Sequence, residues 1–371
     1  MKFKVETKQL KNALSKIITI TDKKTFGQLS GLSLISAEKD QIKITSFDNE
    51  LFGQVSIPAI NDEETEFCIN AKNLFDIVKE LDSEVLDFDL NQESNTINLH
   101  SIKSFYSLLI YPTTEFPRFH LPTNLEEISI TPQNITEMIT YTNHAVSNDD
   151  TRIYLNGIFF QVVNNSIRAV ATDGHRLSML ESSFEGDNSD IFETGIIIPK
   201  KGISEIKRMA DDPETEKIYL KVNESFLYVS NHKNYNLSIR LISRDYPKYQ
   251  AVIPNNIISK VKTDRNSIFE AVKRIRIMAS DKSNQIRLNI FENKLELSAN
   301  HPSLGNAKEV VDVAYDGKDF EIGFNAKYLV DSLGALTDGD ISLELTNEMS
   351  PVVIKSNSNP NYLGIIMPLK L

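Results

Sequence analysis

The stretch Asn70-Ala71-Lys72 opens an apolar-periodic segment, and the same three residues return at Asn325-Ala326-Lys327. Pro199-Lys200-Lys201 opens a similar segment near the midpoint of the chain. A second landmark repeats at nearly the same offset, because Tyr106–Pro112 matches Tyr362–Pro368. A period of about 125 residues is too long for a solenoid unit and fits a whole domain. The sequence therefore predicts three tandem copies of one domain, which favours a symmetric or ring-like scaffold over an active site.

Two proline-containing stretches separate the copies. Glu115–Pro122 and Asp245–Pro254 each hold two prolines, and each pairs an aromatic residue with Pro and a second aromatic residue. Proline fixes φ and removes a backbone donor, so such stretches end strands and bridge domains. We therefore expect domains at residues 1–122, 125–248 and 250–371.

Each copy shows the same order of patterns, namely helix, strands, helix and strands. Apolar residues three or four apart, such as Leu10, Leu14 and Ile17, indicate the helices, and alternating runs such as Gln41–Thr45 indicate the strands. The predicted helices span residues 7–17, 71–80, 131–143, 200–209, 264–277 and 326–336. The predicted class is α+β with antiparallel sheet, each domain consisting of two helix-plus-sheet halves.

Composition places the chain among ordinary globular proteins. Of its 371 residues, 40% are hydrophobic and 25% are charged. No apolar run approaches the roughly 20 residues of a membrane helix, and the N-terminus lacks the apolar segment of a signal peptide. Cys68 is the single cysteine, which excludes an internal disulfide and a multi-cysteine metal site. We therefore expect a reducing, cytoplasmic location and no membrane partner.

Charge is unevenly distributed along the chain. The formal net charge of −11 argues against a general nucleic-acid binder. The predicted helices nevertheless carry a net positive charge, with Lys and Arg outside their apolar stripes. If the helices share one side of the molecule, that side is basic and attracts a polyanion without reading its bases. The alternative is that Lys and Arg are simply good helix formers that face solvent.

The densest polar cluster is Thr172–Leu177, where Asp173 and His175 flank Gly174. An Asp–His pair is typical of acid–base chemistry, but a His beside Gly in a turn is more often structural. The remaining histidines lack metal-ligand spacing, and no GxGxxG, GxxxxGK[ST] or GxSxG motif is present. We therefore expect no catalytic residue, metal or cofactor. The apolar C-terminus, Leu363–Leu371, reads as a final core strand or as the wall of an apolar pocket for partner peptides.

Five motifs together resemble the beta subunit of bacterial replicative DNA polymerase, the sliding clamp. They are Ala171–Leu177 (ATDGHRL), Tyr154–Gly157, Pro199–Gly202, Ile322–Asn325 and Met367–Leu371. The resemblance implies a non-catalytic processivity factor made of three copies of one domain. Two chains would join head to tail into a ring that has helices inside and sheets outside and encircles double-stranded DNA. The implied partners are the replicative polymerase subunit, an ATP-driven clamp loader, and other polymerases and repair proteins that dock through short peptides.

The resemblance also assigns roles to individual residues. The groove for partner peptides would include Arg152, Tyr154, Leu155, Thr172, Gly174, His175, Leu177, Pro247, Val252, Asn325, Tyr328, Ile365, Met367 and Pro368. DNA-facing positions would be Lys24, Lys72, Asp149, Ile153 and Tyr154, and the basic-helix pattern adds Lys200 and Lys201. The head-to-tail contact would join Tyr106 and Leu108 to Ile277 and Met278.

Two of these positions depart from the family pattern. Asp149 stands where the family has a polar amide, and Ile153 stands where it has a tyrosine. Two other functions remain open from the residues alone. A scaffold that binds only proteins would ignore DNA, and an enzyme using Asp173 and His175 would lose turnover on His175→Ala.

Overall fold

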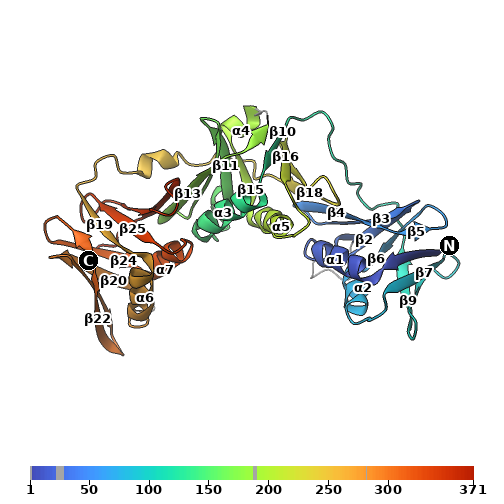
Figure 1. Ribbon diagram of the computed structural model, residues 1–371, viewed down its shortest axis with the longest axis horizontal. Coiled ribbons are helices and arrows are strands. Elements are labelled where there is room, and N and C mark those ends of the chain that lie inside the picture. The colour runs from blue at the N-terminus through green and yellow to red at the C-terminus, as the bar shows by residue number, and fades with distance from the viewer. Residues whose placement is uncertain (1, 22–28, 187–189, 281) are drawn as a thin grey trace. The chain divides into compact units, whose positions relative to one another are not determined.

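The computed structural model describes residues 2–21, 29–186, 190–280 and 282–371, and Figure 1 labels its elements. Its helices follow the predicted order, with one addition, the short α4, which lacks the repeated pattern. The α-helices are α1 Thr7–Ile17, α2 Ala71–Val78, α3 Pro132–Thr142, α4 Asp190–Thr194, α5 Lys200–Ala210, α6 Arg265–Arg276 and α7 Ala326–Gly334.

The repeated asparagines mark helix starts because their side chains cap them. The Asn70 side chain accepts a hydrogen bond from the backbone N–H of Asn73 (2.9 Å), and the Asn325 side chain accepts one from Lys327 N–H (2.9 Å). Each asparagine thus satisfies a backbone donor that the first helical turn leaves unpaired. Pro199 ends β15 and α5 follows directly at Lys200, so the third repeat is also a strand-to-helix boundary.

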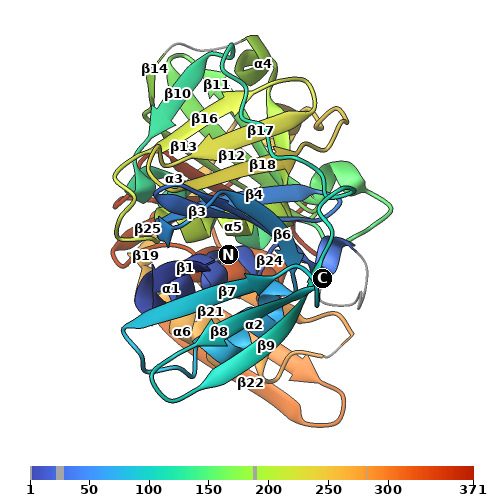
Figure 2. The same cartoon turned by 90° about the vertical axis from the view of Figure 1, so that its right-hand side faces the viewer.

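Backbone contacts group the described residues into two compact units. The first takes in residues 2–132 and 204–241 together with β14. Its strands are β1 Lys2–Glu6, β2 Ser33–Glu38, β3 Gln41–Phe47, β4 Leu51–Pro58, β5 Ile60–Asn61, β6 Thr65–Ile69, β7 Val85–Asn91, β8 Thr96–His100, β9 Phe105–Tyr111, β10 Glu127–Ile130, β14 Glu185–Gly186, β16 Ile218–Val222, β17 Phe226–Ser230 and β18 Tyr235–Arg240. They form one sheet in the order β14-β10-β16-β17-β18-β4-β3-β2-β6-β9-β8-β7-β1-β5, and Figure 2 shows β16, β17, β18, β4 and β3 in succession.

The second unit takes in residues 133–184, 190–203 and 242–371. Its strands are β11 Gly157–Val163, β12 Ser166–Thr172, β13 Arg176–Ser182, β15 Ile196–Pro199, β19 Ser259–Asp264, β20 Gln285–Phe291, β21 Lys294–His301, β22 Gly305–Asp312, β23 Ala314–Tyr315, β24 Phe320–Asn325, β25 Asp340–Leu345, β26 Val352–Ser356 and β27 Tyr362–Ile366. Nine of them form a sheet in the order β15-β11-β12-β13-β27-β26-β25-β19-β23, and β22-β21-β20-β24 form another.

Every strand pair among the described residues is antiparallel, and two of the pairs join different thirds of the chain. In the first unit β4 pairs with β18, placing Val55 opposite Tyr235. In the second unit β13 pairs with β27, placing Leu180 opposite Tyr362. The thirds are therefore connected by continuous main-chain hydrogen bonding at these two strand joints, as well as by the linker peptides.

Amphipathic helices cover the sheets from within each unit. Leu10 and Leu14 of α1 and Leu74 and Val78 of α2 are fully buried, and the two helices contact one another. Lys8 and Lys11 of α1 and Lys72 of α2 are exposed. The predicted separation of apolar and basic helix faces is thus present. None of the helices in the described ranges is both long and apolar enough to cross a membrane.

The C-terminus differs from the expectation of a core strand that continues to the last residue. Burial ends with β27 at Ile366, and Leu371 is 47% exposed. The last residues instead run beside β24, where the Leu369 N–H donates to the Gly323 carbonyl (2.8 Å). A Cβ at position 323 would lie 2.9 Å from the Leu369 carbonyl oxygen, so glycine allows this close approach.

Candidate functional site

An apolar cluster in the second unit collects residues from distant parts of the sequence. Its buried members include Phe159, Leu177, Tyr249 and Ile365. Tyr154, Tyr246, Val252, Ile253 and Leu363 are partly buried and pack against it. The cluster thus brings together four residues of the predicted groove, namely Tyr154, Leu177, Val252 and Ile365. They come from η3 (Ile153–Leu155), β13, η4 (Tyr249–Val252) and β27.

The turn between β12 and β13 borders this cluster, and its sequence explains its shape. Gly174 has φ of +90°, a conformation that glycine adopts without strain. One oxygen of the Asp173 carboxylate accepts hydrogen bonds from the backbone N–H groups of His175 (2.9 Å) and Arg176 (3.1 Å). The Thr172 hydroxyl donates to the Arg176 carbonyl (2.6 Å). The ATDGHRL motif therefore encodes a self-bonded hairpin turn.

Arg176 ties this turn to α7. Its side chain is 8% exposed and pairs with the carboxylates of Asp173 (3.1 Å) and Asp331 (2.7 Å). Its guanidinium also lies 4.6 Å from the centroid of the Tyr328 ring, within the range of a cation–π contact. The His175 ring stacks on the Tyr328 ring, with the two ring centroids 6.0 Å apart. Arg176 therefore holds the Tyr328 ring, and the His175 ring in turn stacks on Tyr328.

The loop of residues 147–156 forms the opposite border. The Asp149 carboxylate accepts hydrogen bonds from Thr151 N–H (2.9 Å), Thr151 Oγ1 (2.6 Å) and Arg152 Nε (2.9 Å). These donors, led by the Thr151 hydroxyl, lower the pKa of Asp149 to about 2. The Leu155 N–H donates to the Arg152 carbonyl (2.8 Å). The loop is thus closed around an ionised carboxylate.

The C-terminal tail adds a third border. The Met367 N–H donates to the His175 carbonyl (2.9 Å), which fastens the tail to the β12–β13 turn. Met367 and Pro368 are half-buried beside it. Asn325 caps α7, on which Tyr328 lies one turn further along.

The predicted groove residues differ in how much of each side chain solvent can reach. Leu155, Leu177 and Ile365 are buried, so they support the site from beneath. The half-buried members are Arg152, Tyr154, Thr172, Val252, Asn325, Tyr328, Met367 and Pro368. Gly174, His175 and Pro247 are exposed.

Sequence reasoning missed several aromatic members of the cluster. Phe159 stacks on Tyr246, with centroids 4.7 Å apart, and Tyr249 packs edge-on against Phe159. The signal was available, because Tyr246 and Tyr249 flank Pro247 in the stretch from which only Pro247 and Val252 were assigned to the groove. Arg176 was likewise quoted within a motif but given no role.

The other predicted contact residues are distributed over several elements. Lys24 lies outside the described residues. Lys72 is exposed on α2, and Ile153 is 44% exposed on η3. Lys200 begins α5 and donates to the Asn148 side chain, and burial lowers the pKa of its ammonium group. Of the predicted dimer contacts, Ile277 is 72% exposed, Tyr106 is 36% exposed, and Leu108 and Met278 are half-buried.

His144 is a largely buried titratable group behind this site. Its Nε2 lies 3.3 Å from the Ser332 hydroxyl. Burial, and after it the charge of Arg176, lowers the pKa of His144 to about 4, against the opposing effect of Asp331 and Asp173. The folded state therefore resists a proton that the unfolded chain accepts below about pH 6.5.

We expect the free energy of unfolding to fall between about pH 6.5 and pH 4 because of His144. The loss contributed by this group approaches about 3 kcal/mol at the acid end of the window. Urea unfolding followed by circular dichroism at several pH values measures it, with His144→Asn as the variant that cannot titrate. An equally steep acid loss in His144→Asn would refute the assignment.

Neither a metal site nor an acid–base pair emerges from the described residues. Across the described ranges, no group of three or more His, Cys, Asp or Glu could hold a metal ion. Asp173 is occupied by backbone and Arg176 donors, and His175 faces an aromatic ring.

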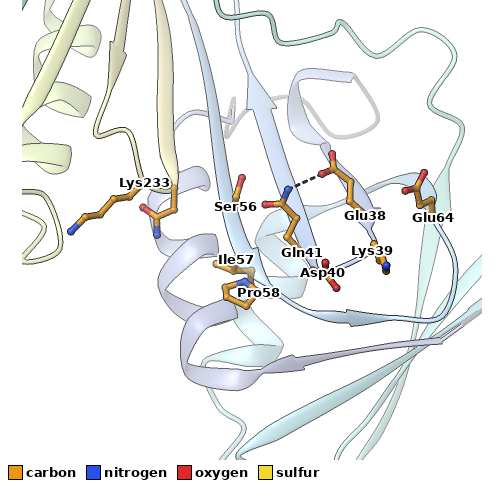
Figure 3. A pocket seen from close by; sticks show the side chains of 10 residues that line it. Glu38, Lys39, Asp40, Gln41, Ser56, Ile57, Pro58, Glu64 and Lys233 are labelled. Atoms are coloured by element: carbon orange, nitrogen blue, oxygen red, sulfur yellow. Dashed lines mark hydrogen bonds between the residues drawn. The ribbon is translucent and has the colours of Figure 1, made fainter.

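A cavity of about 710 Å³ lies in the first unit, where Figure 3 shows Glu38, Asp40 and Glu64 around it and Gln41 bonded to Glu38. It shares no residue with the predicted site.

Comparisons with known proteins cover the whole chain. Models of the DNA polymerase III beta subunit match residues 1–122 (N-terminal domain), 129–248 (central domain) and 250–370 (C-terminal domain). The beta sliding clamp of Vibrio cholerae is 27% identical over 375 residues, covering 100% of both chains.

Solved structures agree with the sequence comparisons. The DNA polymerase III subunit beta of Pseudomonas aeruginosa superposes with a TM-score of 0.93 at 26% identity, covering 100% of both chains. A sliding clamp from the same organism bound to griselimycin superposes with a TM-score of 0.92, also at 26% identity and 100% coverage of both chains. The three domain matches together account for the threefold repeat, so the chain belongs to the DNA polymerase III beta-subunit family of bacterial sliding clamps.

Proposed function

We propose that this chain is a non-catalytic DNA sliding clamp in the cytoplasm. Two copies close head to tail into a ring, with helices inside and sheets outside, that encircles duplex DNA. The ring tethers the replicative polymerase subunit and other replication and repair proteins, and an ATP-driven loader opens it. The observation that carries the proposal is the match of three clamp domains over the whole chain. It also supports the domain limits 1–122, 125–248 and 250–371.

The strand joints give a physical reason for ring closure. In each internal joint, the third strand after the first helix of a domain (β4 after α1, or β13 after α3) pairs with the last strand of a domain (β18 or β27). By the same count, β22 is the third strand after α6 in the third domain, and β9 is the last strand of the first domain. β22 is an edge of its sheet, and residues 105–109 of β9 pair with β8 alone among the described strands. Unpaired edges are templates for pairing with another chain, so a second copy would complete the third joint.

Replacing Ile277 by Asp is expected to convert the dimer into monomers. Ile277 is 72% exposed in the single chain, so the substitution does not strain the monomer. In a closed joint it would bury an uncompensated carboxylate, at a cost of about 3 kcal/mol or more, which is over a hundredfold in the dimer Kd. Sedimentation velocity over a dilution series measures the change.

Ile60→Asp is the matched control for the dimer experiment. Ile60 is 74% exposed and lies on β5, an end strand of the first sheet that is separated from β9 by β8, β7 and β1. It should leave the dimer intact. Dimers that persist in Ile277→Asp would remove Ile277 from the joint.

Basic side chains on the helices suit weak, sequence-independent attraction to DNA. Lys72, Lys200 and Lys201 lie on α2 and α5, and we propose that they face the duplex. Because a closed ring holds DNA by topology, modest positive charge is sufficient, in agreement with the net charge of −11. Strong phosphate contacts would slow sliding.

The apolar cluster of the second unit is the proposed docking groove for short partner peptides. Its rim is formed by the β12–β13 turn, the loop of residues 147–156 and the C-terminal tail, each held by the hydrogen bonds described above. A solved Pseudomonas aeruginosa clamp is bound to griselimycin, and we propose that griselimycin binds this chain in this groove. Affinity for a single peptide should be modest, which lets partners exchange.

The deciding experiment compares nicked circular duplex with the same duplex cut once, after loader-dependent loading. A clamp stays on the circle and leaves the linear form. The alternative, a scaffold that binds only proteins, would ignore both forms of DNA.

A further inference from the structure

The loop of residues 147–156 contains both a residue that the family resemblance assigns to DNA contact and a residue that it assigns to peptide docking. Asp149 stands at a position assigned to DNA, and Arg152 stands at one assigned to peptide docking. In the structure these two side chains are bonded to each other, Arg152 Nε to Asp149 Oδ2 at 2.9 Å. Both remain partly accessible, with 36% of the Arg152 side chain and 38% of the Asp149 side chain exposed.

The hydrogen bonds of Asp149 leave it poorly suited to contact DNA. Its carboxylate already accepts two bonds from Thr151 and one from Arg152. Its own N–H donates to the Ser147 hydroxyl (3.1 Å), and its carbonyl accepts from Arg152 N–H (3.0 Å). An ionised carboxylate repels phosphate, and this one is directed into its own loop. Asp149 therefore organises the loop locally.

Arg152, once held in this way, reaches the facing border of the docking site. A Cβ placed on Gly174 would lie 2.9 Å from Arg152 Nη1. The guanidinium therefore lies directly against the β12–β13 turn at Gly174. Nε is turned toward Asp149 and Nη1 toward Gly174, so one planar group connects the two borders.

We propose that Asp149 is a positioning residue for partner docking, which holds Arg152 across the gap between its own loop and the turn at Gly174. This rests on the proposed docking function. A flexible arginine would have to be ordered by each arriving ligand, whereas a held arginine is preorganised and lowers that cost. In this chain a position associated with DNA in the family thus serves the docking site instead.

The test uses the full-length protein and griselimycin as the probe, with affinity measured by isothermal titration calorimetry. Asp149→Asn preserves shape but removes the charge that holds Nε, and it should weaken binding about tenfold. The matched control is Asp150→Asn, which removes the neighbouring exposed carboxylate and should leave affinity unchanged.

A double-mutant cycle separates positioning from general damage to the loop. In an Arg152→Ala background, Asp149→Asn should cause no further loss, because the group it holds is already absent. The Arg152 Nε–H signal in NMR spectra should also be protected from exchange in the wild type and lose protection in Asp149→Asn. A purely structural role would weaken binding equally in both backgrounds.

Three results would overturn the proposal. They are unchanged affinity in Asp149→Asn, an equal loss in the Arg152→Ala background, and an Nε–H signal that is indifferent to Asp149. Wild-type protein that fails to bind griselimycin would overturn the docking site itself, and the positioning role with it. That outcome is recognisable because it precedes any comparison of variants.

Discussion

On nicked circular duplex the loaded protein should remain bound for many minutes, and on the same duplex cut once it should be lost within seconds. The reason is topological, since a closed ring around a closed circle cannot separate without breaking one of the two. Linear DNA offers ends over which the ring slides off, however the protein contacts the backbone. Gel filtration of the loaded complex, before and after a single restriction cut, measures the difference.

Salt provides the control for the retention experiment. A protein held by several phosphate contacts loses roughly 10³–10⁵ in affinity between 50 and 200 mM salt. Retention on the circle should change little over that range, because the helices supply only modest charge and the ring supplies the hold. Equal retention on linear and circular DNA, or a steep salt dependence on the circle, would contradict the clamp mechanism.

Arg176→Met should lower the free energy of unfolding of the second unit by about 3 kcal/mol. The substitution keeps the apolar stem but leaves the carboxylates of Asp173 and Asp331, 14% and 28% exposed, without their shared cation. The Tyr328 ring loses its cation–π partner as well. Because the chain has no tryptophan, circular dichroism during urea unfolding is the suitable measurement.

An exposed ion pair supplies the control for Arg176. Arg118 pairs with Glu66 at 2.7 Å, but the two side chains are 47% and 39% exposed. Arg118→Met should therefore cost less than about 1 kcal/mol, as exposed pairs usually do. Similar losses in the two variants would mean that Arg176 is no more than a surface pair. Griselimycin affinity should fall in Arg176→Met, since Tyr328 and the turn both depend on this side chain.

The architecture could be predicted because it depends on local signals that occur more than once. Asn70 and Asn325 cap helices through their own side chains, so their spacing in the sequence reports directly on the repeat. Asp173 and Gly174 likewise determine a turn from within four residues. Signals of this kind need no knowledge of the rest of the fold.

Contacts between distant residues were not predictable in the same way. Arg176 meets Asp331 across 155 positions, and nothing in either local sequence indicates the other. Phe116 lies in a proline-containing stretch predicted to be a linker, yet it is 3% exposed and packs edge-on against Phe47. The groove residues came from family resemblance, and the packing of Tyr246 and Tyr249 beside them became visible only in three dimensions.

The pairing of β4 with β18 and of β13 with β27 has a consequence for anyone who dissects this protein. A fragment cut at the linkers to isolate the middle third would carry two bare strand borders, one on each flank, with their main-chain amides and carbonyls open to solvent. Such borders promote aggregation. The middle third is therefore a poor unit for separate expression, and genetic truncations should keep each paired strand with its neighbour.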